Sequence, residues 1–205
     1  MQNPEKGNIF IISAASGTGK TTLVSRLLQN HNTLRVSVSH TTRAPRTGEE
    51  NGVHYHFVSK EEFERLIAAN AFLEHADVFG NYYGTGIESV QSLCAQGFDV
   101  ILEIDVQGAE QVRRKLPEAC SIFILPPSAE TLAQRLKGRA TDSEDVIQTR
   151  LAKARHEISR SVDFDYVVIN DQLDTAEAEL YAVIRSRRLK TAAQSAFIEN
   201  LLDNF

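Results

Sequence analysis

Short apolar runs along this chain alternate with longer stretches in which apolar residues recur every three or four positions. Five of the short runs are rich in β-branched residues and predict strands at 9–13, 34–38, 100–104, 122–125 and 166–169. The runs at 100–102 and 122–125 are apolar at every position, which is typical of strands covered on both faces. Strands that alternate with helices favour a parallel sheet with right-handed crossovers, so the pattern predicts a three-layer α/β fold.

Segment 39–86 departs from this rhythm because it is rich in Thr, Gly, His, Tyr and Arg. It contains a short alternating run at 54–58 and a helical pattern near 61–70, and Glu74 follows the apolar end of that helix. Residues 80–86 combine glycines with two adjacent tyrosines, which indicates a loop. We therefore expect a small subdomain inserted into the α/β core.

Segment 126–160 is the second departure. Two helices are expected here, the first capped by Ser128 and the second opened, after a turn at Gly138, by the capping box Thr141-x-x-Glu144. The exposed basic residues of this segment suggest a mobile lid. The core of a domain at 7–187 then consists of 7–38, 87–125 and 161–187.

The tail at 188–205 carries a loose apolar stripe. Its members are Leu189, Ala193, Ala196, Leu201 and Phe205, at helical spacing. We expect a C-terminal helix that packs through this stripe rather than a binding device.

The sequence A-A-S-G-T-G-K-T at 14–21 directly follows the first predicted strand and precedes a helical pattern. In a P-loop, glycines let backbone N–H groups surround a polyphosphate, the lysine contributes charge between the outer phosphates, and the following hydroxyl can bind Mg²⁺. Ala14 stands where the general pattern has glycine, a replacement that an ordinary backbone conformation tolerates. The predicted ATP site comprises Ala14, Ala15, Ser16, Gly17, Thr18, Gly19, Lys20, Thr21 and Thr22, with Thr21 as a candidate magnesium ligand.

Composition narrows the class of partner. The chain has 205 residues and a net charge of -5, which argues against a nucleic-acid-binding surface and favours a small nucleotide in a local basic site. No apolar run is long enough to span a membrane, and 1–8 has no signal-peptide character. The two cysteines, Cys94 and Cys120, lack metal spacing and are expected as buried free thiols, so we expect a cytoplasmic protein.

Three further groups of residues are candidates for chemistry, and each has a simpler explanation. Arg43 and Arg46 could hold a second phosphate or be ordinary loop arginines. The acids of Glu103-Ile104-Asp105 lie where parallel strands meet a ligand crevice, although such acids are often only solvated. The lid arginines could close over transferring phosphates or keep a helix soluble; they are Arg135, Arg139 and Arg150.

Together these pieces resemble the guanylate kinase family, which transfers the γ-phosphate of ATP to GMP. The resemblance spans about 8–187 and rests on separated motifs in order: S-G-T-G-K-T at 16–21, S-H-T-T-R-A-P-R-T-G-E at 39–49, G-V-H-Y at 52–55, G-N-Y-Y-G-T at 80–85, I-D-V-Q-G at 104–108 and P-P-S at 126–128. It implies that the GMP pocket is lined by Ser39, Arg43, Arg46, Tyr55, Glu74, Tyr83, Thr85 and Asp105, with Asp105 also considered for the metal.

The same resemblance implies roles for most of these residues, with Ser39 and Thr85 binding the remaining edges of the base. The acceptor phosphate would be held by Arg43, Arg46, Tyr55 and Tyr83, and the guanine N1–H and N2–H₂ groups by Glu74. Lys20 and the three lid arginines would neutralise charge during transfer. ATP, Mg²⁺ and GMP are the expected ligands, while the use of dGMP and the oligomeric state are left open.

Two related functions and one GTP-dependent function are alternatives. A non-catalytic interaction module of the same fold is disfavoured by the intact Gly17, Gly19, Lys20 and Thr21. A kinase for a sugar bisphosphate on this scaffold should lack Glu74, Tyr83 and Thr85. A regulatory GTPase would need an N-K-x-D motif, which the sequence N-D-Q-L-D at 170–174 does not supply.

Overall fold

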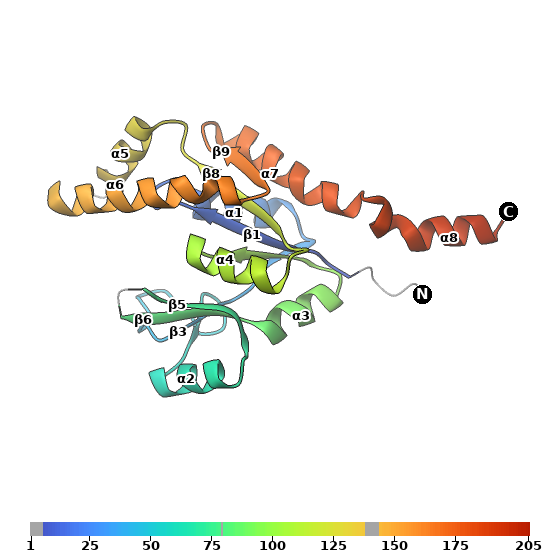
Figure 1. Cartoon of the computed structure of the whole chain (residues 1–205), viewed down its shortest axis with the longest axis horizontal. Helices are drawn as coiled ribbons and strands as arrows, with labels where there is room; N and C mark the ends of the chain where they lie inside the picture. Colours follow the sequence, from blue (N-terminus) through green and yellow to red (C-terminus); the bar gives the residue numbers. More distant parts are fainter. Residues whose placement is uncertain (1–5, 79, 138–143) are drawn as a thin grey trace.

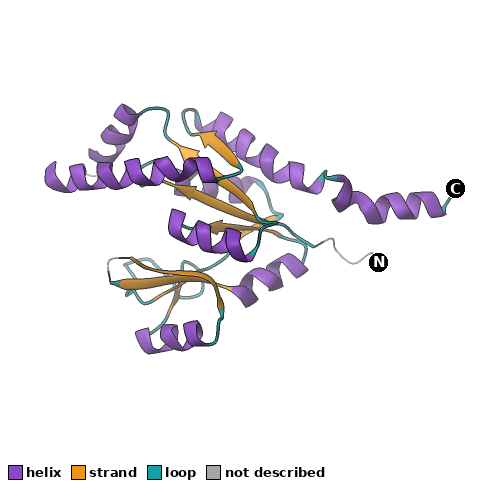
Figure 2. Ribbon diagram, in the orientation of Figure 1, coloured by secondary structure: helices purple, strands orange, loops and turns teal. Residues whose placement is uncertain are grey.

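The computed structural model describes residues 6–78, 80–137 and 144–205. Its centre is a five-stranded sheet in which every pair is parallel and the order is β2-β7-β1-β8-β9 (Figure 2). The strands are β1 (Ile9–Ala14), β2 (Leu34–Val36), β7 (Asp99–Glu103), β8 (Cys120–Leu125) and β9 (Tyr166–Ile169). All five predicted strands are therefore confirmed, together with the α/β class.

Helices cover both faces of this sheet. On one face α1 (Lys20–Asn30) and α7 (Leu173–Arg188) bury Leu23, Leu27 and Leu180 against β1 and β8. On the other face α3 (Ile87–Ala95) and α4 (Val106–Lys115) pack against β1 and β7. The three layers are those predicted, and Cys94 and Cys120 are buried free thiols as expected.

A second, four-stranded sheet lies below the core in Figure 1, with the order β4-β3-β6-β5. Its strands are β3 (His40–Thr41), β4 (His56–Phe57), β5 (Phe72–Val78) and β6 (Asn81–Gly86), and α2 (Lys60–Ala68) packs on it. The expectation of a loop at 80–86 was wrong, because 81–86 form β6. Glu74 follows α2, as expected, and lies in β5. Gly84 gives no turn; a β-carbon there would lie 2.9 Å from Phe63 Cζ, so this glycine admits the aromatic ring of α2.

Two helices lie beside the carboxyl end of the core strands. They are α5 (Ala129–Lys137) and α6 (Glu144–Ser159), and Ser128 Oγ accepts the Thr131 N–H at 3.1 Å, as the predicted cap requires. Gly138 and Thr141, which were expected to form the turn and the second cap, lie outside the described residues. The 3-10 helix η1 (Arg160–Asp163) then leads to β9.

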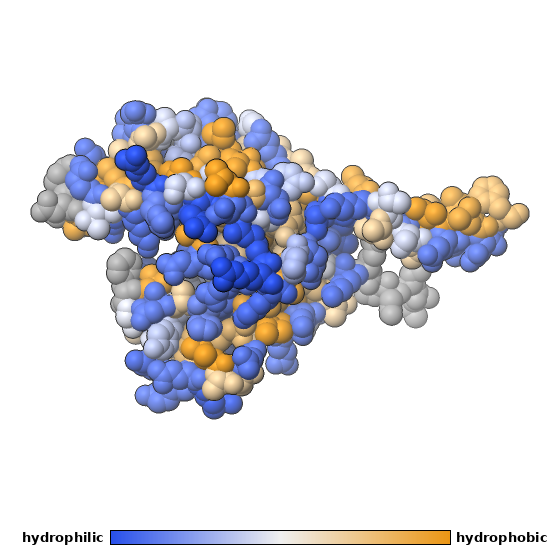
Figure 3. Space-filling model, viewed as in Figure 1, coloured by the Kyte–Doolittle hydropathy of each residue, from blue (hydrophilic) through white to orange (hydrophobic). Residues whose placement is uncertain are grey.

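The tail forms the 3-10 helix η2 (Thr191–Gln194) and α8 (Ser195–Asp203), which project from the body (Figure 1). The predicted helix is present, but the expectation that its stripe packs was wrong. Of the stripe residues, Leu189 is 68% exposed, Leu201 is 49% exposed and Phe205 is 99% exposed. Figure 3 shows apolar side chains along the projecting helix. The reason is that α8 leaves the body beyond α7 and packs mainly against η2. No helix in the described ranges has both the length and the apolar character to cross a membrane.

Candidate active site

The predicted P-loop connects the end of β1 to the start of α1 and lines a cavity of about 330 Å³. Gly17 and Gly19 have φ values of 87° and 90°, a region that glycine enters without strain. Ala14 ends β1 and is not among the residues with positive φ, so its side chain is compatible with the loop. The cavity is lined by Ala14, Ala15, Ser16, Gly17, Thr18, Gly19, Lys20, Thr21, Thr22 and Arg135. The N-terminus of α1 adds its positive dipole, so the cavity is suited to an anion.

Asn170 supports the loop from the end of β9, 152 residues away, and sequence reasoning missed it. Its side-chain amide donates to the Thr18 carbonyl at 2.8 Å, and a β-carbon on Gly19 would lie 2.6 Å from that amide nitrogen. Arg135 of α5 donates to the same carbonyl at 3.1 Å and to the Asn170 carbonyl at 3.4 Å. The loop is thus held in shape by two long-range donors.

A second cavity of about 230 Å³ lies between the two sheets. Its lining includes five of the residues expected in a GMP pocket: Ser39, Tyr55, Glu74, Tyr83 and Asp105. Glu103, Ile104 and Lys153 also line it and were not expected there. The insertion and the core strand β7 therefore build this cavity together.

Glu74 is the buried acid of this cavity, at 4% exposure. Thr85 faces it across the β5–β6 pair and donates its hydroxyl to Glu74 Oε1 at 2.6 Å. Burial is the main cause that raises the pKa of Glu74 to about 7. The hydrogen bond from Thr85 lowers the pKa, and the charge of the neighbouring Asp105 raises it. The buried carboxylate has room for a ligand that brings its own hydrogen-bond donors.

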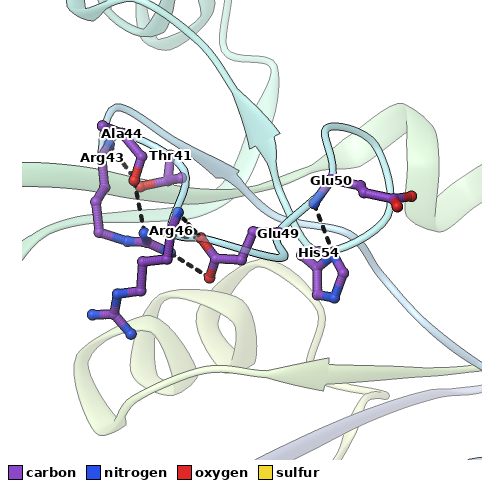
Figure 4. A network of polar contacts seen from close by, with 7 residues as sticks. All are labelled: Thr41, Arg43, Ala44, Arg46, Glu49, Glu50 and His54. Atoms are coloured by element: carbon purple, nitrogen blue, oxygen red, sulfur yellow. Dashed lines mark hydrogen bonds and ion pairs between the residues drawn. The ribbon is translucent and has the colours of Figure 1, made fainter.

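The two predicted phosphate arginines differ in their surroundings. Glu49 accepts from Arg43 at 3.0 Å and 2.9 Å and from the Arg46 backbone N–H at 2.7 Å, which lowers the pKa of Glu49 to about 2 (Figure 4). The Arg43 guanidinium also lies 5.5 Å from the centre of the Tyr55 ring. Figure 4 shows the Arg46 guanidinium pointing away from Glu49. The structure thus brings Arg43, but not the exposed Arg46, to the edge of the second cavity.

The two cavities meet at an ion pair. Lys20 Nζ of the P-loop lies 3.5 Å from Glu103 Oε2, which belongs to the second cavity. Asp105, the other acid of that strand end, caps α4, because its Oδ1 accepts the backbone N–H groups of Gln107 and Gly108. Glu103 lies beside the P-loop lysine and Thr21 lines the P-loop cavity. Carboxylate and hydroxyl oxygens are ligands that suit Mg²⁺.

The lid arginines are only partly tested by the structure. Arg135 lines the P-loop cavity, Arg139 lies outside the described residues, and Arg150 on α6 lines neither of the two cavities described here. The same helix instead contributes Lys153 to the second cavity and buries Glu157 beside the P-loop. Burial raises the pKa of Glu157 although the Ser16 backbone N–H donates to it.

Comparison with known proteins gives one consistent result. The family model described as guanylate kinase matches residues 6–187. Guanylate kinase of Neisseria gonorrhoeae is 72% identical over 97% of both chains, and guanylate kinase of Shewanella oneidensis is 55% identical over 92% of both. The crystal structure of guanylate kinase from Anaplasma phagocytophilum aligns with a TM-score of 0.74 at 34% identity, covering 91% of this chain and 89% of that one. With two adjoining cavities and matching relatives along nearly its whole length, this chain belongs to the guanylate kinase family.

Proposed function

We propose that this protein is a nucleoside monophosphate kinase that transfers the γ-phosphate of ATP to GMP, giving ADP and GDP. The observation that carries the proposal is the pair of adjoining cavities, one formed by a P-loop and the other containing a buried carboxylate. Lys20 and Glu103 mark the point where they meet. A donor phosphate in the first cavity and an acceptor phosphate in the second would lie close enough for direct transfer.

At the donor site we propose that the loop N–H groups and Lys20 bind the outer phosphates of ATP. Asn170 and Arg135 would keep the loop in its phosphate-binding shape through the Thr18 carbonyl. Arg135, Arg139 and Arg150 would add positive charge as the lid closes. The acceptor phosphate is already an anion, so positioning and charge neutralisation suffice and no general base is required.

At the acceptor site we propose that Glu74 receives the N1–H and N2–H₂ groups of guanine. Ser39 and Thr85 would bind the remaining edges of the base, and Asp105 would close the pocket. Adenine has an acceptor where guanine has N1–H, so an acceptor would face the buried Glu74 carboxylate and the hydrogen bonds to guanine would be lost. Sites built on such hydrogen bonds can discriminate by roughly 10⁴-fold. The acceptor phosphate would be held by Arg43, Arg46, Tyr55 and Tyr83.

Magnesium is part of the proposal because the oxygens of Thr21 and Glu103 are ligands that suit it. We propose that Thr21 and Glu103 hold the ion together with the ATP phosphates. When bound, Mg²⁺ would neutralise phosphate charge and orient the phosphate chain. We place the reaction in purine nucleotide metabolism and in the cytoplasm, and we propose no nucleic-acid partner, in keeping with the net charge of -5.

The test is a coupled assay of ADP formation with ATP-Mg²⁺ and each nucleoside monophosphate, dGMP included. We expect the kcat/KM for GMP to exceed that for AMP by at least about 10³-fold. Discrimination on the order of this size is typical of a site built on hydrogen bonds. Equal rates with GMP and AMP, or no transfer to GMP, would refute the proposal.

A further inference from the structure

The first turn of α4 contains a glycine whose missing side chain leaves room for the Glu74 carboxylate. A β-carbon built on Gly108 would lie 2.7 Å from Glu74 Oε2 and 3.3 Å from the Ile104 β-carbon. Unbonded heavy atoms that close repel one another, since favourable contacts begin near ~3.5 Å. Any side chain at position 108 would therefore have to displace the carboxylate.

The backbone itself gives no reason for glycine at this position. Gly108 is not among the glycines with positive φ, and its N–H donates to Asp105 Oδ1 at 2.9 Å as part of a regular helix cap. Alanine would favour the helix more than glycine does. A buried glycine here weakens the helix, so the physical reason that remains is space, above all for Glu74, whose Oε2 makes the closest contact, and less for Ile104.

The two oxygens of Glu74 are thus fixed from two different elements. Oε1 accepts the Thr85 hydroxyl of β6 at 2.6 Å, while Oε2 lies against the first turn of α4. We propose that Gly108 is a positioning residue that sets the orientation of the Glu74 carboxylate and so contributes to the choice of guanine as acceptor. This inference rests on the proposed function, because it takes Glu74 as the group that binds the base.

The orientation of the carboxylate matters because guanine offers two parallel donors. Both oxygens reach them only when the carboxylate lies in the plane of the base, and a rotated carboxylate keeps one hydrogen bond at best. The closest obstructing atom, Glu74 Oε2, is the far end of a side chain, whereas the contact with the Ile104 β-carbon at 3.3 Å needs a shift of only a few tenths of an ångström, on the order of the gap to a normal contact. Gly108→Ala should therefore move the carboxylate and leave the fold intact. A misplacement of about 1 Å can cost roughly 100-fold in rate.

The first experiment measures steady-state kinetics and thermal unfolding of Gly108→Ala. We expect the KM for GMP to rise about 10- to 100-fold while the KM for ATP and the Tm stay close to those of the parent. The matched control is Gln107→Ala, an exposed neighbour in the same helical turn, which should leave the KM for GMP unchanged. A KM for GMP within about threefold of the parent would overturn the inference.

The second experiment asks whether the effect passes through Glu74. Glu74→Asp shortens the side chain by one methylene and withdraws the carboxylate from Gly108, at a cost in GMP activity of its own. In that background, Gly108→Ala should reduce kcat/KM for GMP by less than about threefold, since contacting residues give non-additive effects. Equal losses in both backgrounds would assign Gly108 a general structural role and overturn the inference.

The remaining outcomes are also decisive. If Gly108→Ala alone does not fold but the double variant does, the steric contact with Glu74 is confirmed by the recovery of folding. If neither folds, the carboxylate does not absorb the displacement and the inference is wrong. A parent protein that fails to phosphorylate GMP refutes the proposed function itself, whereas an active parent with an unaffected Gly108→Ala refutes only the inference.

Discussion

Replacing Glu74 by Gln should both stabilise the protein above neutral pH and remove its preference for GMP. Glutamine keeps the shape of the side chain, and its oxygen can still accept from Thr85. What it loses is a negative charge in a site that is 4% exposed. The two effects have opposite signs, so they can be measured separately.

The stability effect follows from the direction of the pKa shift. Burial raises the pKa of Glu74 from 4.5 to about 7, so between these values the folded protein binds more protons than the unfolded chain. Stability of the parent therefore falls, through this residue, as the pH rises from 4.5 to about 7, and stays lowered above that. At about 1.4 kcal/mol for each pKa unit, the ionised Glu74 costs the folded state about 3 kcal/mol.

The assay is urea unfolding of parent and Glu74→Gln at pH 5 and pH 8 without nucleotide. The free energy of unfolding of the variant relative to the parent should increase by about 2 to 3 kcal/mol between the two pH values. Glu179→Gln, on the exposed face of α7, is the control for the substitution itself. A difference that is the same at both pH values would mean that Glu74 titrates as it does in water, which would contradict its buried environment.

The kinetic effect tests the guanine assignment with the same variant. In the variant an amide nitrogen, rather than an oxygen, would face the guanine donors. The transition-state stabilisation measured by kcat/KM for GMP should therefore fall by about 2 to 4 kcal/mol, while the affinity for ATP should hardly change. The ratio of parent to variant kcat/KM should also decline below pH 7, as the parent carboxylate becomes protonated. An unchanged GMP value would leave Glu74 as a buried acid without a role in base recognition.

Three further results are expected. Lys20→Ala should abolish most phosphoryl transfer while calorimetry still detects GMP binding, because the two phosphates occupy different cavities; activity within a few-fold of the parent would reject the phosphate role of Lys20. Asn170→Ala should raise the KM for ATP roughly tenfold and leave the KM for GMP unchanged, because it removes the buried donor to the Thr18 carbonyl at a cost of about 1 to 3 kcal/mol. Equal increases in the KM for both nucleotides would argue against a local effect on the loop. Hydrogen exchange should show added protection at 39–86 and 126–160 only when an ATP analogue and GMP are both bound, and unchanged protection would refute closure.

The sequence alone determined the features that depend on neighbouring residues. Apolar runs of β-branched residues predict buried strands because period and composition reflect burial directly, and all five core strands were found in this way. The P-loop is equally local, since Gly17 and Gly19 adopt the positive φ that the motif needs within one short segment. The resemblance of separate motifs then indicated the family, which the comparisons confirmed.

The division of the domain at 7–187 into an insertion (39–86), a lid (126–160) and a core (7–38, 87–125 and 161–187) remains a prediction. So do the roles of the individual site residues. The strand at 81–86 was misread as a loop because glycine is usually a turn signal, whereas Gly84 is there to admit the ring of Phe63. Phe63 belongs to α2, so the sequence around Gly84 does not indicate why glycine is needed there. The exposed apolar face of α8 was missed in the same way, because helical spacing says which residues share a face but not what covers it.

Tertiary structure decided the geometry of the site. The β5–β6 register places Thr85 beside Glu74, α4 places Gly108 against the same carboxylate, and β7 places Glu103 beside Lys20. Asn170 reaches the P-loop from 152 residues away. Residues separated by such distances meet only after the sheets have formed and packed, so no local pattern can encode which of them will touch. The sequence determines which chemical groups are present, whereas the tertiary structure determines which of them are in contact.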